Sequence, residues 1–99
     1  MRFEIVFAAA VESHLRVLTA AERARVLDEI ERNLGHEPLR EARNRRPLRP
    51  NPVAPWELRV GALRVFYETG TDSPATVRIV AIGKKRGNVL SIGGKEIKI

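Results

Sequence analysis

The sequence predicts a single α+β domain in which two helices pack on one face of a mainly antiparallel sheet. Three observations support this class. The apolar residues alternate at the start of the chain and then take up helical spacing as far as residue 34. From residue 56 onwards the apolar runs are short, rich in β-branched residues and separated by turns that contain glycine. The length of 99 residues suits one hydrophobic core and no second domain.

A strand and a short helix open the chain. Phe3, Ile5 and Phe7 recur with a period of two, which predicts that they share the buried face of a half-buried strand. The apolar spacing then changes to steps of four and three, which predicts a helix over residues 8–18.

A second helix is expected to pack against the first as an antiparallel hairpin. Thr19-Ala20-Ala21-Glu22 has the pattern of a capping box, in which the threonine hydroxyl and the glutamate satisfy backbone amides reciprocally. Leu27, Ile30 and Leu34 form the apolar stripe of this helix. Gly35 follows at the position of a left-handed cap, so we expect the helix to end there.

Residues 36–55 change the character of the chain, because they hold five of the six prolines and five arginines. A loop of this length in so small a domain is uncommon and tends to be functional. Prolines fix φ, which favours a stiff basic arm over the alternative of a flexible linker. The five arginines are Arg40, Arg43, Arg45, Arg46 and Arg49.

Strands are predicted for most of the remaining chain. Trp56–Val60 and Leu63–Glu68 form a hairpin around a tight turn at Gly61-Ala62. Thr76–Ile82 is expected to be the next strand of the same meander, buried on one face and partly on the other. Gly93-Gly94 separates two short apolar runs, which suggests a final hairpin with a type I′ turn.

Basic residues are gathered into two blocks. The chain carries 18 basic and 12 acidic residues, for a net charge of +6. Residues 40–64 hold seven of the basic and two of the acidic residues, and residues 84–98 hold five and one. A basic surface kept only for solubility would scatter this charge, so the blocks favour binding of a polyanion, above all RNA. A solvated basic surface is the alternative.

Several kinds of site are excluded by the residues available. The chain has no cysteine, which excludes disulfides, thiolate zinc sites and a cysteine nucleophile, and which favours the cytoplasm. The two histidines, His14 and His36, have no metal-ligand spacing, so we predict no metal and no cofactor, and we expect His14 on the surface. No apolar run is long enough to span a bilayer, and no export segment is expected.

A basic triplet, Lys84-Lys85-Arg86, lies between Gly83 and Gly87. It lacks the glycine spacing and the Ser or Thr of a Walker phosphate loop. We expect its cationic side chains to converge on a phosphodiester at the end of the strand, with simple solvation as the alternative. Arg59 and Arg64 flank the tight turn of the hairpin, and the faces on which they lie depend on a register that the sequence leaves open.

The hairpin and the strand that follows it resemble a known family. The segments concerned are Trp56-Glu57-Leu58-Arg59-Val60-Gly61, Arg64-Val65-Phe66-Tyr67-Glu68 and Val80-Ala81-Ile82-Gly83-Lys84-Lys85-Arg86, with Arg46-Pro47-Leu48-Arg49 upstream. They look like the corresponding segments of the RelE/ParE superfamily, which comprises toxins of bacterial type II toxin-antitoxin modules. The start of the chain fits the same family, so the resemblance makes residues 1–99 one RelE/ParE-like domain.

This resemblance implies a compact toxin that, in the RelE branch, enters the ribosome and cleaves messenger RNA without a metal. The nucleophile there is the 2′-hydroxyl group of the RNA itself. Arg64 and Lys85 match basic residues of the family and carry over as catalytic cations. The implied partners are a cognate antitoxin, the ribosome and messenger RNA. The other basic residues expected to contact RNA are Arg43, Arg45, Arg46, Arg49, Arg59, Lys84 and Arg86.

The chain departs from the RelE pattern at residues that would move protons. Pro55 and Glu57 stand where RelE-type enzymes have lysines, Arg46 stands where some relatives have a glutamate, and Ser91 is nearest to a tyrosine of others. Glu57 or Glu37 is the candidate general base, although an exposed glutamate among arginines is ionised and a weak base. Two alternatives therefore stay open: a ParE-like inhibitor of DNA gyrase without catalysis, and an RNA-binding family member that is not toxic.

Overall fold

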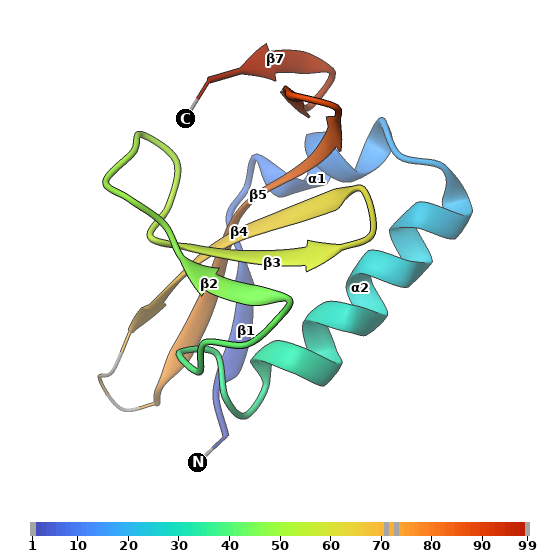
Figure 1. Cartoon of the computed structure of the whole chain (residues 1–99). Coiled ribbons are helices and arrows are strands. Elements are labelled where there is room, and N and C mark those ends of the chain that lie inside the picture. Colours follow the sequence, from blue (N-terminus) through green and yellow to red (C-terminus); the bar gives the residue numbers. More distant parts are fainter. Residues whose placement is uncertain (1, 71, 73, 99) are drawn as a thin grey trace.

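The computed structural model describes residues 2–70, 72 and 74–98, which form two helices and seven strands (Figure 1). In chain order the elements are β1 (Glu4–Phe7), α1 (Val11–Arg16), α2 (Ala20–Leu34), β2 (Arg45–Pro47), β3 (Trp56–Val60), β4 (Leu63–Gly70), β5 (Thr76–Arg86), β6 (Val89–Ile92) and β7 (Lys95–Ile97). The sheet has the order β2-β3-β4-β5-β6-β7, and β1 pairs with β5. Only this last pair is parallel among the described strands. The predicted α+β class is therefore confirmed.

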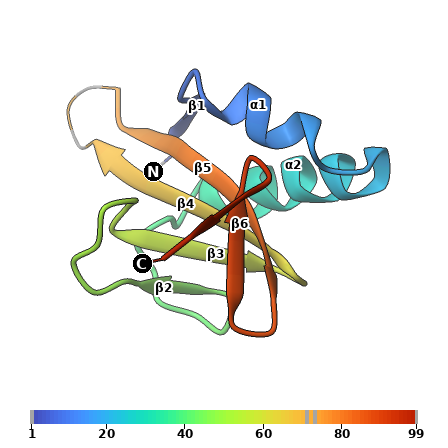
Figure 2. The same cartoon turned by 90° about the horizontal axis from the view of Figure 1, so that it is seen from above.

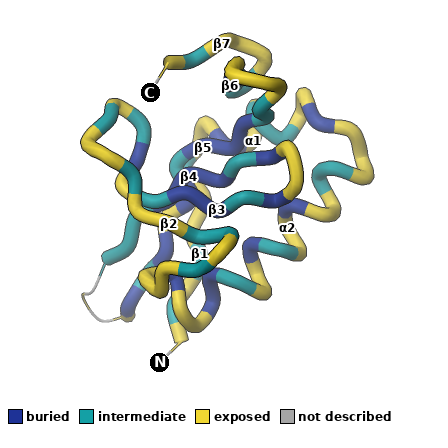
Figure 3. Tube along the Cα trace, viewed as in Figure 1, coloured by how far each residue is buried: buried dark blue, intermediate teal, exposed yellow. Residues whose placement is uncertain are grey.

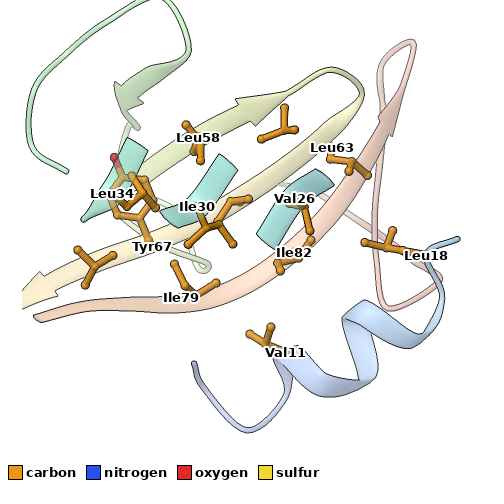
Figure 4. Close-up of a cluster of buried hydrophobic side chains, with 13 residues drawn as sticks. Val11, Leu18, Val26, Ile30, Leu34, Leu58, Leu63, Tyr67, Ile79 and Ile82 are labelled. Carbon is orange, nitrogen blue, oxygen red and sulfur yellow. The ribbon is translucent and has the colours of Figure 1, made fainter. Parts of the chain in front are cut away.

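Both helices lie on one side of the sheet (Figure 2). Val26, Ile30 and Leu34 of α2 are buried and belong to one core cluster with sheet residues such as Leu58 (Figure 4). Each such side chain contributes about 1.5–3 kcal/mol through burial. Leu27 was expected in this stripe, but it is 37% exposed because the buried stripe steps by four from Val26. Among the described helices, none has the length and apolarity needed to cross a bilayer.

The ends of α2 show how its backbone groups are satisfied. The capping box is confirmed, since the Glu22 amide donates to Thr19 Oγ1 at 3.1 Å and the Thr19 amide donates to Glu22 Oε1 at 2.9 Å. The prediction of a left-handed Gly35 is wrong, because its φ is −70°. Its carbonyl instead accepts from the Phe3 amide at 2.8 Å, so the N-terminal segment satisfies a carbonyl group at the end of α2.

Strand β5 pairs with two different strands along one of its edges. β4 pairs along the other edge, while β1 pairs with residues 76–79 and β6 with residues 83–86. In the gap between them the Ile82 amide donates to Nδ1 of His14 at 3.3 Å. The predicted end of this strand at Ile82 is wrong, because β5 continues to Arg86, and His14, which was expected on the surface, is half-buried against this strand. Burial of the imidazole lowers the pKa of His14 below its ordinary value.

The N-terminal elements differ from the prediction in extent. Phe3 and Ile5 pack against the core as expected, but Phe7 is 44% exposed at the end of β1, which forms an outer edge of the sheet. The first helix covers Val11–Arg16 and is shorter than residues 8–18. Leu18 is nevertheless buried in the main core, so the chain reaches α2 without leaving the hydrophobic layer.

Residues 36–55 are not an arm, because they fold back onto the sheet. The predicted loop contains β2, whose position at an edge suits Pro47, a residue with no amide to donate to another strand. Tyr67 donates its hydroxyl proton to the Pro38 carbonyl at 2.6 Å and anchors the chain after α2. Asn51 closes the loop after β2, donating to the carbonyls of Arg49 and Ala54 at 2.7 and 2.9 Å.

A second and smaller core lies on the face of the sheet that the helices leave uncovered. Phe66 and Ala81 of the sheet are buried there together with Ala54 of the loop and Leu90 of β6. In Figure 1 the loop after β2 and the C-terminal hairpin both lie above β3 and β4, and in Figure 3 many of the dark-blue buried stretches lie on the central strands. Because residues of both segments pack into this smaller core, the two segments lie on the same face of the sheet.

Glycines permit the two predicted tight turns and one close crossing. Gly61 has φ +60°, and Gly93 and Gly94 have φ +60° and +82°, as a type I′ turn requires at both central positions. Both predicted hairpins are thus confirmed. Gly83 matters for another reason, because a Cβ atom there would lie 2.7 Å from the Ser91 carbonyl oxygen and 2.9 Å from Cγ1 of Ile92.

Gly83→Ala should therefore destabilise the protein, because β6 crosses too close to leave room for a methyl group. We expect a loss of about 1–3 kcal/mol in the free energy of unfolding, measured in urea. Gly35→Ala is the control, since Gly35 has φ −70° and its nearest neighbour would be 3.2 Å from the added Cβ. A Gly83→Ala protein as stable as wild type would contradict the close crossing.

Candidate functional site

A groove with a volume of about 890 Å³ lies on the face of the sheet without helices. One wall is the segment from Arg46 to Asn51, and the other is the C-terminal hairpin. Apolar side chains in its lining include Leu48, Val89 and Ile97. Its charged lining residues are Arg46, Arg49, Glu57, Arg64, Lys85, Glu96 and Lys98. Five cations against two carboxylates make this groove the main candidate site for an anionic ligand.

The sheet register decides which arginines share this face. Arg59 of β3 lies directly opposite Arg64 of β4, and Arg46 of β2 lies opposite Glu57 of β3. Because side chains of a strand alternate between faces, Glu57 and Arg59 point to the same side. The faces left open by the sequence are thereby settled, and these four charged side chains form one cluster.

Glu57 lies at the centre of this cluster and is buried, with only 8% of its side chain exposed. Its Oε1 atom is 3.2 Å from Nε of Arg59 and 3.5 Å from Nε of Arg46. The expectation of an exposed glutamate is wrong, because β3 lies between β2 and β4 and both neighbouring arginines cover the carboxylate.

Arg64 is held against the backbone at the turn between β3 and β4. Its Nη1 atom donates to the carbonyls of Gly61 at 2.7 Å and Leu63 at 2.9 Å. Burial lowers the pKa of the Arg64 guanidinium, the Glu57 carboxylate raises it, and the nearby Arg59 and Arg46 guanidinium groups lower it. The group nevertheless stays protonated at neutral pH, because an arginine does not deprotonate in that range.

The basic triplet does not converge as predicted. Lys85 lines the groove, but Lys84 points to the helical side and its ammonium group lies 2.6 Å from Oε2 of Glu22. The reason is that the triplet belongs to β5, where neighbouring side chains alternate between faces. Arg86 is exposed and lines a separate cavity of about 240 Å³. Only Lys85 of the three therefore remains a candidate for the groove.

Arg45 and Arg43 also lie outside the groove lining. Arg45 donates through Nη1 to the carbonyls of Asn33 at 2.7 Å and Glu37 at 3.1 Å, so it fastens the chain to the end of α2. Arg43 is exposed in the tight turn that joins Ala42 to Arg45. Of the arginines expected to contact RNA, Arg46 and Arg49 line the groove directly, and Arg59 adjoins it through its contact with Glu57.

Some residues of the groove were not predicted. Lys98, Asn88 and Glu96 line it from the C-terminal hairpin. Lys98 belongs to the second basic block, so its charge was a usable signal, but its approach to the sheet depends on how β6 crosses at Gly83. That crossing belongs to the hairpin of β5 and β6, which the prediction did not contain because it ended the strand at Ile82.

Few groups in the groove lining are suited to proton transfer. Among the described residues, its carboxylates are Glu57 and Glu96, and it contains no histidine or tyrosine. Glu37 lies elsewhere and pairs with Arg40 at 2.8 Å, which lowers the pKa of Glu37. Ser91 lines the smaller cavity and not the groove. The site is therefore well equipped to bind an anion and sparsely equipped for acid-base chemistry.

Comparison with known proteins bears on the arrangement of the elements. Neither the protein-family models nor the curated proteins contain a match to the chain. Among solved structures it is similar to a chain of the toxin-antitoxin complex RelBE2 from Mycobacterium tuberculosis, with a TM-score of 0.68 and 24% identity. The match covers 86% of this chain and all of the other. The chain has a RelE-like fold. The expected RelE-like fold is thus confirmed, and the groove occupies the helix-free face of its sheet.

The substitution Lys84→Met tests whether the ion pair between Lys84 and Glu22, on the helical side of the sheet, stabilises the fold. Hydrogen bonds from the Lys84 ammonium group and the Thr19 amide lower the pKa of Glu22 from 4.5 to about 2. Ionised Glu22 therefore stabilises the folded state above about pH 4.5, and this contribution is lost as the pH falls towards 2. The variant should melt below wild type at pH 7, and the difference should shrink on acidification.

The matched control for this measurement is Lys85→Met, one residue further along β5. Lys85 forms no ion pair within the described parts of the chain, so its variant should melt close to wild type throughout the pH series. Equal behaviour of the two variants in thermal unfolding would show that the Glu22–Lys84 pair does not stabilise the fold.

Proposed function

We propose that the protein is the toxin of a type II toxin-antitoxin module and that it cleaves messenger RNA on the ribosome. The basic groove carries this proposal. Arg64 and Lys85 lie in it and form no ion pair with a carboxylate of the described chain, so their charge is available to a phosphate group. The RelE-type toxin fold supports the toxin class, since the similar solved structure is a toxin-antitoxin complex.

In the proposed reaction, the 2′-oxygen of one nucleotide attacks the neighbouring phosphorus atom. The bond from phosphorus to the 5′-oxygen of the next nucleotide breaks, which leaves a 2′,3′-cyclic phosphate and a free 5′-hydroxyl. One proton leaves the nucleophile and one is taken up by the leaving oxygen. Arg64 and Lys85 would stabilise the negative charge that develops on the non-bridging oxygens. The sheet holds both cations in place, so little reorganisation is needed during the reaction.

The remaining cations of the groove are placed where they can bind the backbone of the RNA strand. Arg46, Arg49 and Lys98 stand on its two walls, where they can contact phosphates on either side of the reacting one. The apolar residues Val89 and Ile97 offer surface to unstacked bases, which is how proteins usually recognise single-stranded RNA. A cognate antitoxin would neutralise the toxin as its second partner, and the cytoplasm would be the compartment in which it meets ribosomes.

A second candidate function is inhibition of DNA gyrase by binding alone. The scarcity of acid-base groups in the groove favours it, because a protein that only binds needs no proton transfer. The groove cations would then contact an acidic surface of gyrase or its DNA. The unpaired groove cations favour RNA over this candidate, since cations held on a rigid sheet suit the stabilisation of a reacting phosphate.

Arg64→Ala and Lys85→Ala should each reduce cleavage of messenger RNA in a cell-free translation system by about 100-fold, because each removes a cation from the reacting phosphate. Lys84→Ala is the matched control, since it removes the same charge from the adjacent residue but on the other face of the sheet. Cleavage is read by mapping RNA ends, and folding of each variant is checked by thermal unfolding.

Gyrase supercoiling is assayed beside translation with the same proteins. Unchanged translation together with lost supercoiling would reject the nuclease in favour of gyrase inhibition. If the double variant Arg64→Ala/Lys85→Ala still blocked translation fully, the groove would not be the active site. A wild-type protein that binds RNA and leaves both processes unaffected would identify a non-toxic RNA-binding protein.

A further inference from the structure

The arrangement of Arg46, Glu57 and Arg59 is more specific than a patch of positive charge. Both arginines approach the same carboxylate oxygen, Oε1 of Glu57, and both do so through Nε. A guanidinium group has five N–H donors, so this contact leaves the terminal Nη groups of each arginine for other partners. Within the described chain, the Nη atoms of these two arginines make no hydrogen bond.

Burial differs sharply within the cluster. The Glu57 side chain is 8% exposed, whereas those of Arg46 and Arg59 are 50% and 40% exposed. The carboxylate is therefore fixed beneath the two guanidinium groups, which face solvent. A buried carboxylate requires charged partners, and in turn it holds two like-charged side chains next to each other despite their repulsion.

We propose that Glu57 is a positioning residue that holds Arg46 and Arg59 side by side, with their Nη groups free to bind one phosphate of an RNA strand in the groove. This inference rests on the proposed RNA-binding function. It assigns Glu57 a role other than general base, because its carboxylate is the shared partner of two guanidinium groups.

The proposal gives Glu57→Gln an effect opposite to the one expected from charge alone. Removing a negative charge from a basic groove should strengthen binding of a polyanion. Loss of the shared carboxylate would instead let the two arginines move apart, and both would have to be ordered again when RNA binds. Glu96→Gln is the matched control, since Glu96 lines the same groove and forms no ion pair among the described residues.

The experiment measures binding of a short single-stranded 2′-O-methyl RNA, which is not cleaved because it lacks the nucleophile. We expect Glu96→Gln to bind about twofold more tightly than wild type, and Glu57→Gln about fivefold more weakly, as the cost of ordering two side chains implies. Tighter binding by both variants would overturn the positioning role. If Glu57→Gln bound like Glu96→Gln but no longer cleaved unmodified RNA, Glu57 would be a base instead.

A second variant keeps the inference testable if Glu57→Gln does not fold. Arg46→Lys preserves the net charge at a half-exposed position, but an ammonium group cannot contact Glu57 and offer a planar fork to phosphate together. We expect it to weaken binding several-fold more than Arg49→Lys, because Arg49 lines the groove without a carboxylate partner in the described chain. Equal effects of the two substitutions would contradict the shared role of Arg46 and Glu57.

Nuclear magnetic resonance separates failure of this inference from failure of the proposed function. The Nε–H proton of Arg59, which is hydrogen-bonded to Oε1 of Glu57, should exchange with solvent more slowly in wild type and in Glu96→Gln than in Glu57→Gln. Fast exchange in wild type would disprove the shared carboxylate contact whether or not RNA binds. Slow exchange in a wild-type protein that binds no RNA would instead reject the proposed function, and with it the proposed binding of a phosphate by Arg46 and Arg59.

Discussion

Backbone pairing along β5 is the interaction on which the rest of the structure depends. Its one edge is taken by β4, and its other edge is divided between β1 near the start and β6 near the end. His14 of α1 accepts from the Ile82 amide in the interval, so the divided edge is also joined to the helical layer. One strand thus connects both ends of the described chain, the helices and a wall of the groove.

The alternation of side chains along these strands sorts charge between the two faces. On β3, Leu58 enters the helical core while Glu57 and Arg59 stay on the groove side. On β5, Lys84 pairs with a helix and Lys85 lines the groove. The segments that line the groove carry both acidic and basic residues, yet the groove has a net positive charge. Binding of an anionic ligand therefore depends on the register of the strands more than on the net charge of +6 of the whole chain.

Local patterns predicted the parts of the fold that local interactions determine. The capping box at Thr19 and the turn at Gly93-Gly94 need only neighbouring residues, and both are present as expected. β2 was missed because three residues ending in a proline carry no periodicity of their own and pair only when β3 is in place. The burial of Glu57 was missed for the same reason, since Arg46 reaches it from β2. If this strand had been predicted to continue to Arg86, the alternation of side chains would have placed Lys84 and Lys85 on opposite faces of the sheet.

Binding and cleavage place different demands on this groove. Cations on a rigid sheet satisfy the first demand, because phosphate recognition needs charge and geometry. Cleavage also requires a group that moves a proton, and Glu57 is committed to two arginines. Of the carboxylates in the described lining, this leaves Glu96, which stands on the opposite wall in β7. A nuclease that moves a proton with a free carboxylate of this lining would therefore use Glu96, whereas a gyrase inhibitor needs no such group.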